Sequence, residues 1–276
     1  MRVTAEPTVL ELDDRPVKRG AWFGDLWAHR DVFVIMSKAG FQSTYKRSSL
    51  GIIWAVAVPL LQALVITVVF AKLIQIGSGR EFGLFVLSGI GPWSYFSGVL
   101  GQGATAIVDG TGMTDKVWFP RALLPGVPLM VNLPPFLITL GVLAVSQPIL
   151  GGSFGLRMLW FIPAGALLIA FSGALVLALS ALHVYFRDVR FLVQAALIVW
   201  FYVTPIAYPA SRAGTLRPFF DFNPVTGIVG LFRNAVMSGG GENMRALTVS
   251  LAATFVLLVV GLEAQRRYDR LFVDLL

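Results

Sequence analysis

The sequence predicts an all-α polytopic membrane protein, and two observations support this prediction. Of the 276 residues, 56% are hydrophobic and only 13% are charged, which gives a mean hydropathy of +0.76. A soluble domain carries roughly 25% charged residues, so this chain has more apolar surface than a soluble core absorbs. The second observation is that six stretches of 17 to 35 residues contain no Asp, Glu, Lys, Arg or His. A helix of ~20 residues crosses the hydrocarbon of a bilayer, so each stretch is a candidate span.

Five of the six stretches are long enough to span outright, and the last is marginal because it needs flanking side chains to snorkel. The longest stretch contains five prolines, so we expect only its middle to span, with a kink. Six crossings place both termini on the same side. The stretches run from Ser48 to Ala71, Phe82 to Val108, Ala122 to Leu156, Met158 to Leu182, Phe191 to Ser211, and Ala246 to Leu262.

Lysines and arginines between the stretches predict the orientation. Fifteen of the 22 lie in the N-terminal 47 residues, the Asp109–Arg121 and His183–Arg190 segments and the C-terminal tail, and seven lie on the opposite side. The positive-inside rule therefore predicts a multi-pass protein of the bacterial cytoplasmic membrane with both termini in the cytoplasm. The first 19 residues lack the apolar region of a cleavable signal peptide. We expect residues 1–19 to be a flexible cytoplasmic tail, 48–263 the six-span domain and 264–276 a second cytoplasmic tail.

The sequences of two parts of the chain predict helices that do not cross the membrane. Residues 20–47 are expected to form an interfacial amphipathic helix and a linker, because apolar and polar side chains separate onto two helical faces. The apolar face holds Trp22, Phe23, Leu26, Phe33 and Val34, and the polar face holds Asp25, His29 and Arg30. Residues 208–245 are too long for a turn, and VTGIVGLFRNAV within them predicts a short re-entrant or external helix.

The sequence lacks the groups that would power transport by itself. The candidate spans hold no ionisable side chain, whereas ion-driven transporters keep such groups inside the bilayer. No Gly-Lys dipeptide occurs, so the chain has no P-loop for ATP. We therefore expect a membrane conduit rather than an enzyme, with its work done by another polypeptide.

Metal and nucleic-acid sites are also not expected. The chain has no cysteine, and His29 and His183 are far apart in sequence. The formal charge of +7 arises from short basic clusters between apolar stretches, not from the single patch typical of a nucleic-acid-binding protein. We expect no cofactor or metal bound by this chain.

The segment KVWFPRALLP, residues 116–125, lies on the expected cytoplasmic side between the second and third spans. A short helix there, stiffened by Pro120 and edged by charged side chains, would fit a groove on a cytosolic ATPase and transmit its movement to two spans. The charged side chains are Asp115, Lys116 and Arg121. The residues alone leave a second interpretation equally open, an ordinary positive-inside loop with Trp118 and Phe119 as interfacial anchors.

Four stretches together resemble the membrane subunit of type-2 ABC exporters of lipid-linked polysaccharides, the group that includes O-antigen, teichoic-acid and galactan permeases. They are YKRSSLGIIWAVAVPL before and within the first span, KVWFPRALLP after the second, VYFRDVRFLVQ before the fifth, and YVTPIAYP followed by FNPVTGIVGLFRNAV on the external side. The four occur in the family's order, and each lies where the charge distribution predicts. The resemblance extends over most of the chain.

The resemblance implies a homodimer with two copies of a separate cytosolic P-loop ATPase, which would bind ATP and magnesium. It also implies that the interfacial helix and the segment Thr114, Asp115, Lys116, Val117, Trp118, Phe119, Pro120 and Arg121 contact the ATPase. Arg187 and Asp188 in HVYFRDVR would contact the ATPase or have a structural role, pairing with each other or with backbone at the helix ends.

A lipid-linked glycan presents an isoprenoid tail, a pyrophosphate and a long neutral sugar chain. Tyr45, Lys46 and Arg47, just before the first span, are candidates for the pyrophosphate, and the alternative is that they only determine topology. Seven aromatic residues are candidates to line a glycan path, with a lipid-facing aromatic belt as the alternative. They are Trp54, Trp93, Tyr95, Phe96, Trp200, Phe201 and Tyr202.

Two further predictions concern packing and substrate. Ser94 and Gly98 form a small-xxx-small pair, followed by Gly101 and Gly103, which predicts close contacts between spans. The absence of charge from the candidate spans favours an uncharged polymer. An exporter of similar build for a drug or small lipid, and a passive lipid scramblase or membrane scaffold, are the competing functions.

Overall fold

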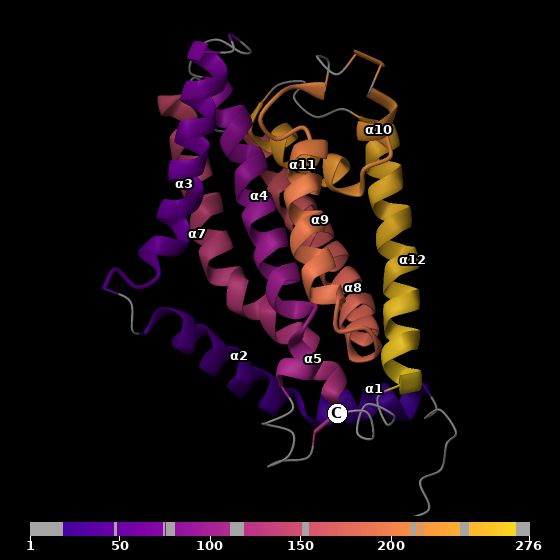
Figure 1. The fold of residues 1–276 in the computed structure, drawn as a ribbon. Helices are drawn as coiled ribbons and strands as arrows, with labels where there is room; N and C mark the ends of the chain where they lie inside the picture. The colour runs from indigo at the N-terminus through magenta and orange to yellow at the C-terminus, as the bar shows by residue number, and fades with distance from the viewer. Residues whose placement is uncertain are drawn as a thin grey trace, which may run out of the picture.

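The computed structural model describes residues 19–46, 49–73, 75, 81–110, 119–150, 155–210, 214, 215, 217–237 and 243–268. Within these residues every regular element is helical, as the sequence predicts. The long helices run side by side as a bundle, and two helices from the N-terminal part lie across one end of it (Figure 1). The last turn of the final helix reaches the same end, which we call the α1/α2 end.

Five helices are long and apolar enough to cross a membrane. Helix α7 occupies the middle of the longest uncharged stretch, as expected, and contains four of its five prolines. The five are α3 (Ile53–Val68) with the π-helical η1 (Val69–Leu73), α4 (Glu81–Gly103), α7 (Val127–Ile149) after the 3-10 helix η2 (Arg121–Gly126), α8 (Phe161–Tyr185) after the 3-10 helix η3 (Leu156–Trp160), and α12 (Met244–Tyr268).

The fifth predicted span forms the shorter helix α9 (Val189–Val203), whose 15 residues extend only about 22 Å. It ends there because Thr204 precedes Pro205, and a residue before proline is pushed out of the helical region; Thr204 is extended, with φ −94° and ψ 131°. The sixth uncharged stretch, Ala246 to Leu262, is marginal by its own length but forms a helix long enough to span. Polar residues at both of its ends join α12, which has 25 residues. A sixth crossing would require the short helix α9 to span the membrane, so the number of six crossings stays a prediction.

The N-terminal helix consists of two pieces, α1 (Arg19–Ala28) and α2 (Arg30–Tyr45). His29 separates them, and its Nδ1 lies 2.9 Å from the backbone oxygen of Asp25. Trp22 is buried, whereas Phe23 is half exposed, so the predicted apolar face is only partly covered within this chain. Helix α2 packs on α7 and η2, and the Phe33 ring lies 3.0 Å from where a side chain at Gly126 would begin.

Helix α4 is the centre of the core and packs against α3, α7, α8 and α11. Its sequence EFGLFVLSGIGPWSYFSGVLGQG has apolar or small residues on all sides, which is typical of a buried helix. The largest fully buried side chains include Phe96 of α4, Phe171 of α8 and Phe232 of α11. The rings of Phe96 and Phe171 stack with centroids 5.7 Å apart.

The small residues of α4 permit the close contacts that the sequence predicts. A Cβ on Gly103 would lie 2.5 Å from a methyl of Val176 on α8, and one on Gly98 would lie 2.7 Å from Oδ1 of Asn132 on α7. Gly101 is different, because no heavy atom lies within 4 Å of its missing Cβ. Two of the three glycines therefore bring neighbouring helices close to α4.

Two short helices at the opposite end of the bundle confirm the prediction of a short helix within residues 208–245 (Figure 1), and the side of the membrane that they face stays a prediction. Helix α10 (Arg217–Asp221) is followed by α11 (Pro224–Val236), whose 13 residues are too few to span. Almost all of α11 is buried, and it packs on α4, α8 and α12. We call this end the α10/α11 end.

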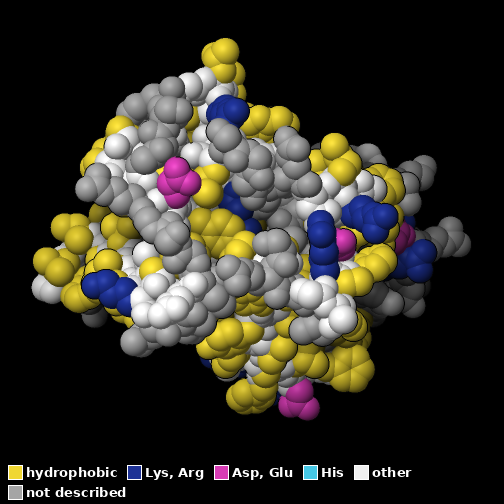
Figure 2. Space-filling model, turned by 90° about the horizontal axis from the view of Figure 1, so that it is seen from above, with side chains coloured by type: hydrophobic (Ala, Val, Ile, Leu, Met, Phe, Trp, Pro, Cys, Tyr) yellow, Lys and Arg dark blue, Asp and Glu magenta, His cyan; other side chains and the backbone are white. Residues whose placement is uncertain are grey.

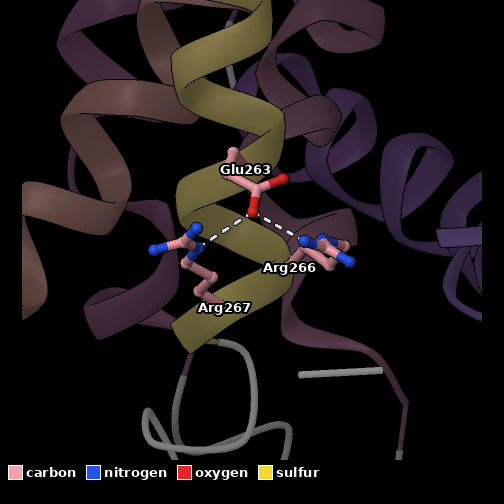
Figure 3. A network of polar contacts seen from close by, with 3 residues as sticks. All are labelled: Glu263, Arg266 and Arg267. Carbon is pink, nitrogen blue, oxygen red and sulfur yellow. Dashed lines mark hydrogen bonds and ion pairs between the residues drawn. The ribbon is translucent and has the colours of Figure 1, made fainter. Parts of the chain in front are cut away.

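The polar end of α12 carries a small charge network at the α1/α2 end (Figure 3). Glu263 Oε1 accepts hydrogen bonds from Arg266 at 2.6 Å and from Arg267 at 2.8 Å. In the same turn, Gln265 Nε2 donates to Leu177 O and Ser180 Oγ of α8, both at 2.9 Å. Arginines in the last turn also complement the negative end of the helix dipole, so this end of α12 is held to α8 and is charged on its outer side.

Candidate functional site

The predicted ATPase-contacting segment is described only at its end. Thr114, Asp115, Lys116, Val117 and Trp118 lie outside the described residues, so their role stays a prediction. Phe119 is only 5% exposed, which differs from the surface position expected of an interfacial anchor. Pro120 precedes η2 in an extended conformation, and Arg121 begins that helix.

The second candidate contact with an ATPase lies between α8 and α9. Arg187 and Asp188 are both exposed there. Among the ion pairs of the described residues, none joins Arg187 to Asp188, and the Asp188 side chain does not cap α9. The predicted pairing is therefore not observed, and both side chains are accessible to a partner.

The candidate pyrophosphate residues lie where α2 leads into α3. Tyr45 is the last residue of α2 and Lys46 follows as its C-cap, while Arg47 is outside the described residues. Burial raises the pKa of Tyr45 above its ordinary value, so its hydroxyl stays a neutral hydrogen-bond donor at neutral pH. Tyr45 also faces a groove, together with two of the candidate glycan-lining rings.

The seven aromatic candidates separate into two groups. Trp93 and Phe96 are buried in the core, and Trp200 contacts both Phe96 and Phe171 edge to face, so these three rings pack the interior of this chain. The other four border a surface groove. Trp54 and Tyr95 line one, although only 3% of Tyr95 is exposed, and Phe201 and Tyr202 line another. Trp54, Phe201 and Tyr202 are therefore the rings placed to contact a substrate in this conformation.

The first groove lies between α3, α4 and α7 and has a volume of about 550 Å³. We call it the α3/α4/α7 groove. Its wall combines the rings of Tyr45, Trp54 and Tyr95 with the uncharged polar side chains Gln62, Ser94, Ser97, Asn132 and Thr139, of which the sequence pattern indicates only Ser94, as a packing residue. Apart from its two tyrosines the lining has no ionisable group, so it suits a neutral polar ligand.

The second groove lies between α3 and the end of α9 and has a volume of about 610 Å³. We call it the α3/α9 groove. Its wall is mainly aliphatic and aromatic, with Phe70, Phe201, Tyr202 and Tyr208 among its residues. Gln62 and Val58 of α3 line both grooves.

A polar clamp joins α11 to the end of α9, and Asn223 is its first half. Asn223 Oδ1 caps α11 by accepting from Val225 N at 3.0 Å, and it also accepts from Trp200 Nε1 at 2.8 Å. Asn223 Nδ2 donates to Thr204 Oγ1 at 2.9 Å. One side chain therefore satisfies a helix N-terminus and ties it to the residues where α9 ends.

Arg233 is the second half of the clamp. Its guanidinium is buried, donates to the carbonyls of Pro205 and Ile206, and lies 3.6 Å above the ring of Phe85. No carboxylate pairs with it among the described ion pairs. The charge distribution places Arg233 among the basic residues of the side opposite the termini, and its burial is signalled in the sequence only by its position as a single arginine inside the apolar stretch GIVGLFRNAV.

The face at the α10/α11 end carries few charges. Figure 2 shows that face, with hydrophobic side chains over much of it and lysines and arginines in small separate groups. No continuous basic patch is visible over the described residues there, which agrees with the charge pattern of the sequence.

Comparison with known proteins identifies the family. The ABC-2 type transporter family matches residues 31–237, a region that holds α2 to α11 and therefore both grooves and the clamp. This chain belongs to the ABC-2 type transporter family. With its apolar bundle, it is a multi-pass membrane protein and a transport subunit.

The ABC-2 transporter chain is similar to curated relatives over most of its length. It is 31% identical over 191 residues to the O-antigen export system permease protein RfbA of Myxococcus xanthus, covering 68% of this chain and 72% of that protein. It is 26% identical over 248 residues to the protein of the same name from Klebsiella pneumoniae, covering 89% of this chain and 95% of that one.

Proposed function

We propose that this ABC-2 transporter chain is the permease subunit of an ATP-driven exporter of O-antigen-type polysaccharide carried on a polyprenyl pyrophosphate. The observation that carries the proposal is the family match over residues 31–237 together with relatives named as O-antigen export permeases. The uncharged, aromatic lining of the α3/α4/α7 groove supports it, because sugars offer neutral hydroxyls and apolar C–H faces.

The driving force comes from a separate ATPase in this proposal. The chain has no P-loop sequence, and family membership implies a partner that has one. We infer an assembly of two copies of this chain with two ATPase subunits, which bind ATP and magnesium. The contact surface consists of α1 and α2, the segment Thr114–Arg121 and the exposed pair Arg187 and Asp188 at the α1/α2 end.

The proposed orientation places the α1/α2 end in the cytoplasm and the α10/α11 end outside the inner membrane. The distribution of lysines and arginines supports this orientation, with both termini cytoplasmic. The pyrophosphate then meets Tyr45, Lys46 and Arg47 at the cytoplasmic surface while the tail stays in lipid. The buried helix α11, held by Asn223 and Arg233, closes the external end between transport events.

Co-purification tests the proposed assembly. The chain expressed with a P-loop ATPase subunit from the same organism is expected to purify in gentle detergent as a complex of two copies of each. Recovery of the chain without any ATPase, from membranes where both are present, would contradict the proposal and favour a passive scramblase or scaffold.

Charge reversal at Asp115 and Lys116 together is expected to uncouple ATP hydrolysis from export. The two side chains lie in the segment proposed to fit the ATPase, so reversing both disrupts its complementary charges while the apolar spans still insert. Surface polysaccharide is expected to fall at least tenfold with normal amounts of the variant in the membrane. Reversal of the exposed Arg217 at the opposite end is the control, expected to leave export unchanged. Wild-type export by the double variant would remove the coupling role.

A further inference from the structure

Gln62 is an amide in the middle of the most apolar part of α3, in the sequence IWAVAVPLLQALVITV. Its side chain is exposed on the surface of the chain and makes no hydrogen bond within the described residues. Transfer of an amide from water to hydrocarbon without a hydrogen-bond partner is unfavourable. Lipid tails offer no hydrogen bond, so this face of α3 is poorly suited to contact with them.

The groove beside Gln62 continues this polar character across two other helices. Ser94 and Ser97 of α4 and Asn132 and Thr139 of α7 share its lining. The Ser94 hydroxyl, like the Gln62 amide, makes no hydrogen bond within the described residues, and the Ser94 backbone oxygen accepts from Ser97 Oγ at 3.3 Å. Asn132 uses Nδ2 to reach Pro128 O at 2.8 Å, and no partner among the described residues occupies its Oδ1. The groove therefore keeps both donors and acceptors for a ligand.

Two glycines give the groove its depth. A Cβ on Gly98 would meet Asn132 at 2.7 Å, and one on Gly91 would lie 3.2 Å from the Thr139 methyl. Because both positions lack side chains, the backbone of α4 forms a floor against α7 and the groove keeps its volume of about 550 Å³. Small-molecule sites have volumes of roughly 300–1,000 Å³, so the space suits one or a few sugar rings.

We infer that the α3/α4/α7 groove is a subsite for uncharged sugar residues of the transported glycan, with Gln62 and Asn132 as hydrogen-bonding partners and Trp54 as the stacking surface. The inference rests on the proposed function. Its basis is that the lining has amide and hydroxyl groups, aromatic rings and no Asp, Glu, Lys or Arg. A pyrophosphate or anionic lipid headgroup would leave its charge without a counter-charge in this groove, whereas a neutral sugar would not.

Single-cysteine labelling tests the groove, because the chain has no natural cysteine. Ala55→Cys and Val58→Cys line the groove on α3 without replacing a proposed sugar-binding group, and Leu64→Cys is the control on the same helix, since Leu64 is 59% exposed and lines neither groove. Vesicles holding the chain with its ATPase are treated with a charged methanethiosulfonate reagent. A thiol reacts as thiolate, which forms in water and not in hydrocarbon. Both groove cysteines are expected to react at least tenfold faster than the control, and lipid-linked O-antigen glycan is expected to slow them at least fivefold.

Three results would overturn the inference. Groove cysteines as unreactive as the control would show that lipid fills the groove. Efficient oxidation of Ala55→Cys or Val58→Cys to a disulfide-linked dimer would show that a second copy of this chain covers the groove. Fast labelling that the lipid-linked glycan does not slow, in vesicles whose ATP-driven export is intact, would show a water-filled groove that takes no sugar.

An export measurement separates this inference from the proposed function. Gln62→Leu is expected to lower export at least fivefold and Gln62→Asn to restore part of it. Thr67→Val is the control on the same helix, because the Thr67 hydroxyl bonds its own backbone at Ala63 O, 2.7 Å away. Wild-type export with no loss in Gln62→Leu would refute the subsite alone. No ATP-driven glycan export by the wild type would refute the proposed function, and the labelling rates in glycan-free vesicles would still report whether the groove is wet.

Discussion

Gly227→Ala is expected to prevent α11 from packing and to abolish export. A Cβ at Gly227 would lie 2.6 Å from the backbone carbon of Ala246 on α12 and would also contact the Ala246 oxygen and Ser250 Oγ. The Ala246 atoms are backbone of a 25-residue helix, so they cannot move aside as a flexible side chain would. Overpacking a core typically costs 1–3 kcal/mol, and we expect a cost of at least about 3 kcal/mol for this backbone clash.

The measurement for Gly227→Ala is the thermal midpoint of the purified chain together with its yield in the membrane. Gly165→Ala is the matched control, a buried helical glycine of α8 with no heavy atom within 4 Å of its missing Cβ. Because alanine favours helix over glycine by about 1 kcal/mol, the control is expected to be as stable as the wild type or slightly more so. A Gly227→Ala chain with wild-type stability and export would contradict the packing of α11 on α12.

Arg233→Met is expected to lower export more than tenfold while the chain still folds and inserts. Methionine fills much of the same volume but leaves the Pro205 and Ile206 carbonyls without their donor and removes the cation from the Phe85 ring. Burying a guanidinium is itself costly, so the loss of these contacts is offset in the free energy of unfolding. The larger effect is that α11 loses its tie to the end of α9.

The measurements for Arg233→Met are surface polysaccharide, ATPase activity of the purified complex and thermal midpoint. ATP hydrolysis is expected to persist, because the substitution lies at the end of the bundle opposite the proposed ATPase contact. Arg233→Lys is expected to recover part of the export, since an ammonium donates to one carbonyl but lacks the planar guanidinium fork. Arg245→Met is the control at an exposed arginine of the same end. Full export by Arg233→Met would show that the clamp is not needed.

The fold class and the positions of most helices could be predicted from the sequence because they depend on local apolar length. The errors occur where a few residues decide a boundary. Pro205 ends α9 early, and polar residues beyond Leu262 continue α12 because its last turns pack on α8 through Gln265. The length of an uncharged stretch indicates neither of these helix boundaries.

The candidate site was less predictable, because it depends on which helix faces meet. Aromatic content alone does not distinguish Trp93 and Phe96, which are core residues, from Trp54, which is 45% exposed and faces a groove. Gln62 and Asn132 were overlooked because an uncharged amide does not interrupt a charge-free stretch. Arg233 was treated as a topological charge, although its burial between α4, α9 and α11 comes from tertiary contacts that no spacing in the sequence indicates.

Transport by reconstituted vesicles tests the central claim most directly. The chain is reconstituted with lipid-linked polysaccharide, alone or with its P-loop ATPase, and the glycan moved across the bilayer is measured by its accessibility to a glycan-cleaving enzyme. The account predicts uphill movement only when the ATPase, ATP and magnesium are all present. Uphill movement by vesicles that hold this chain alone would contradict it.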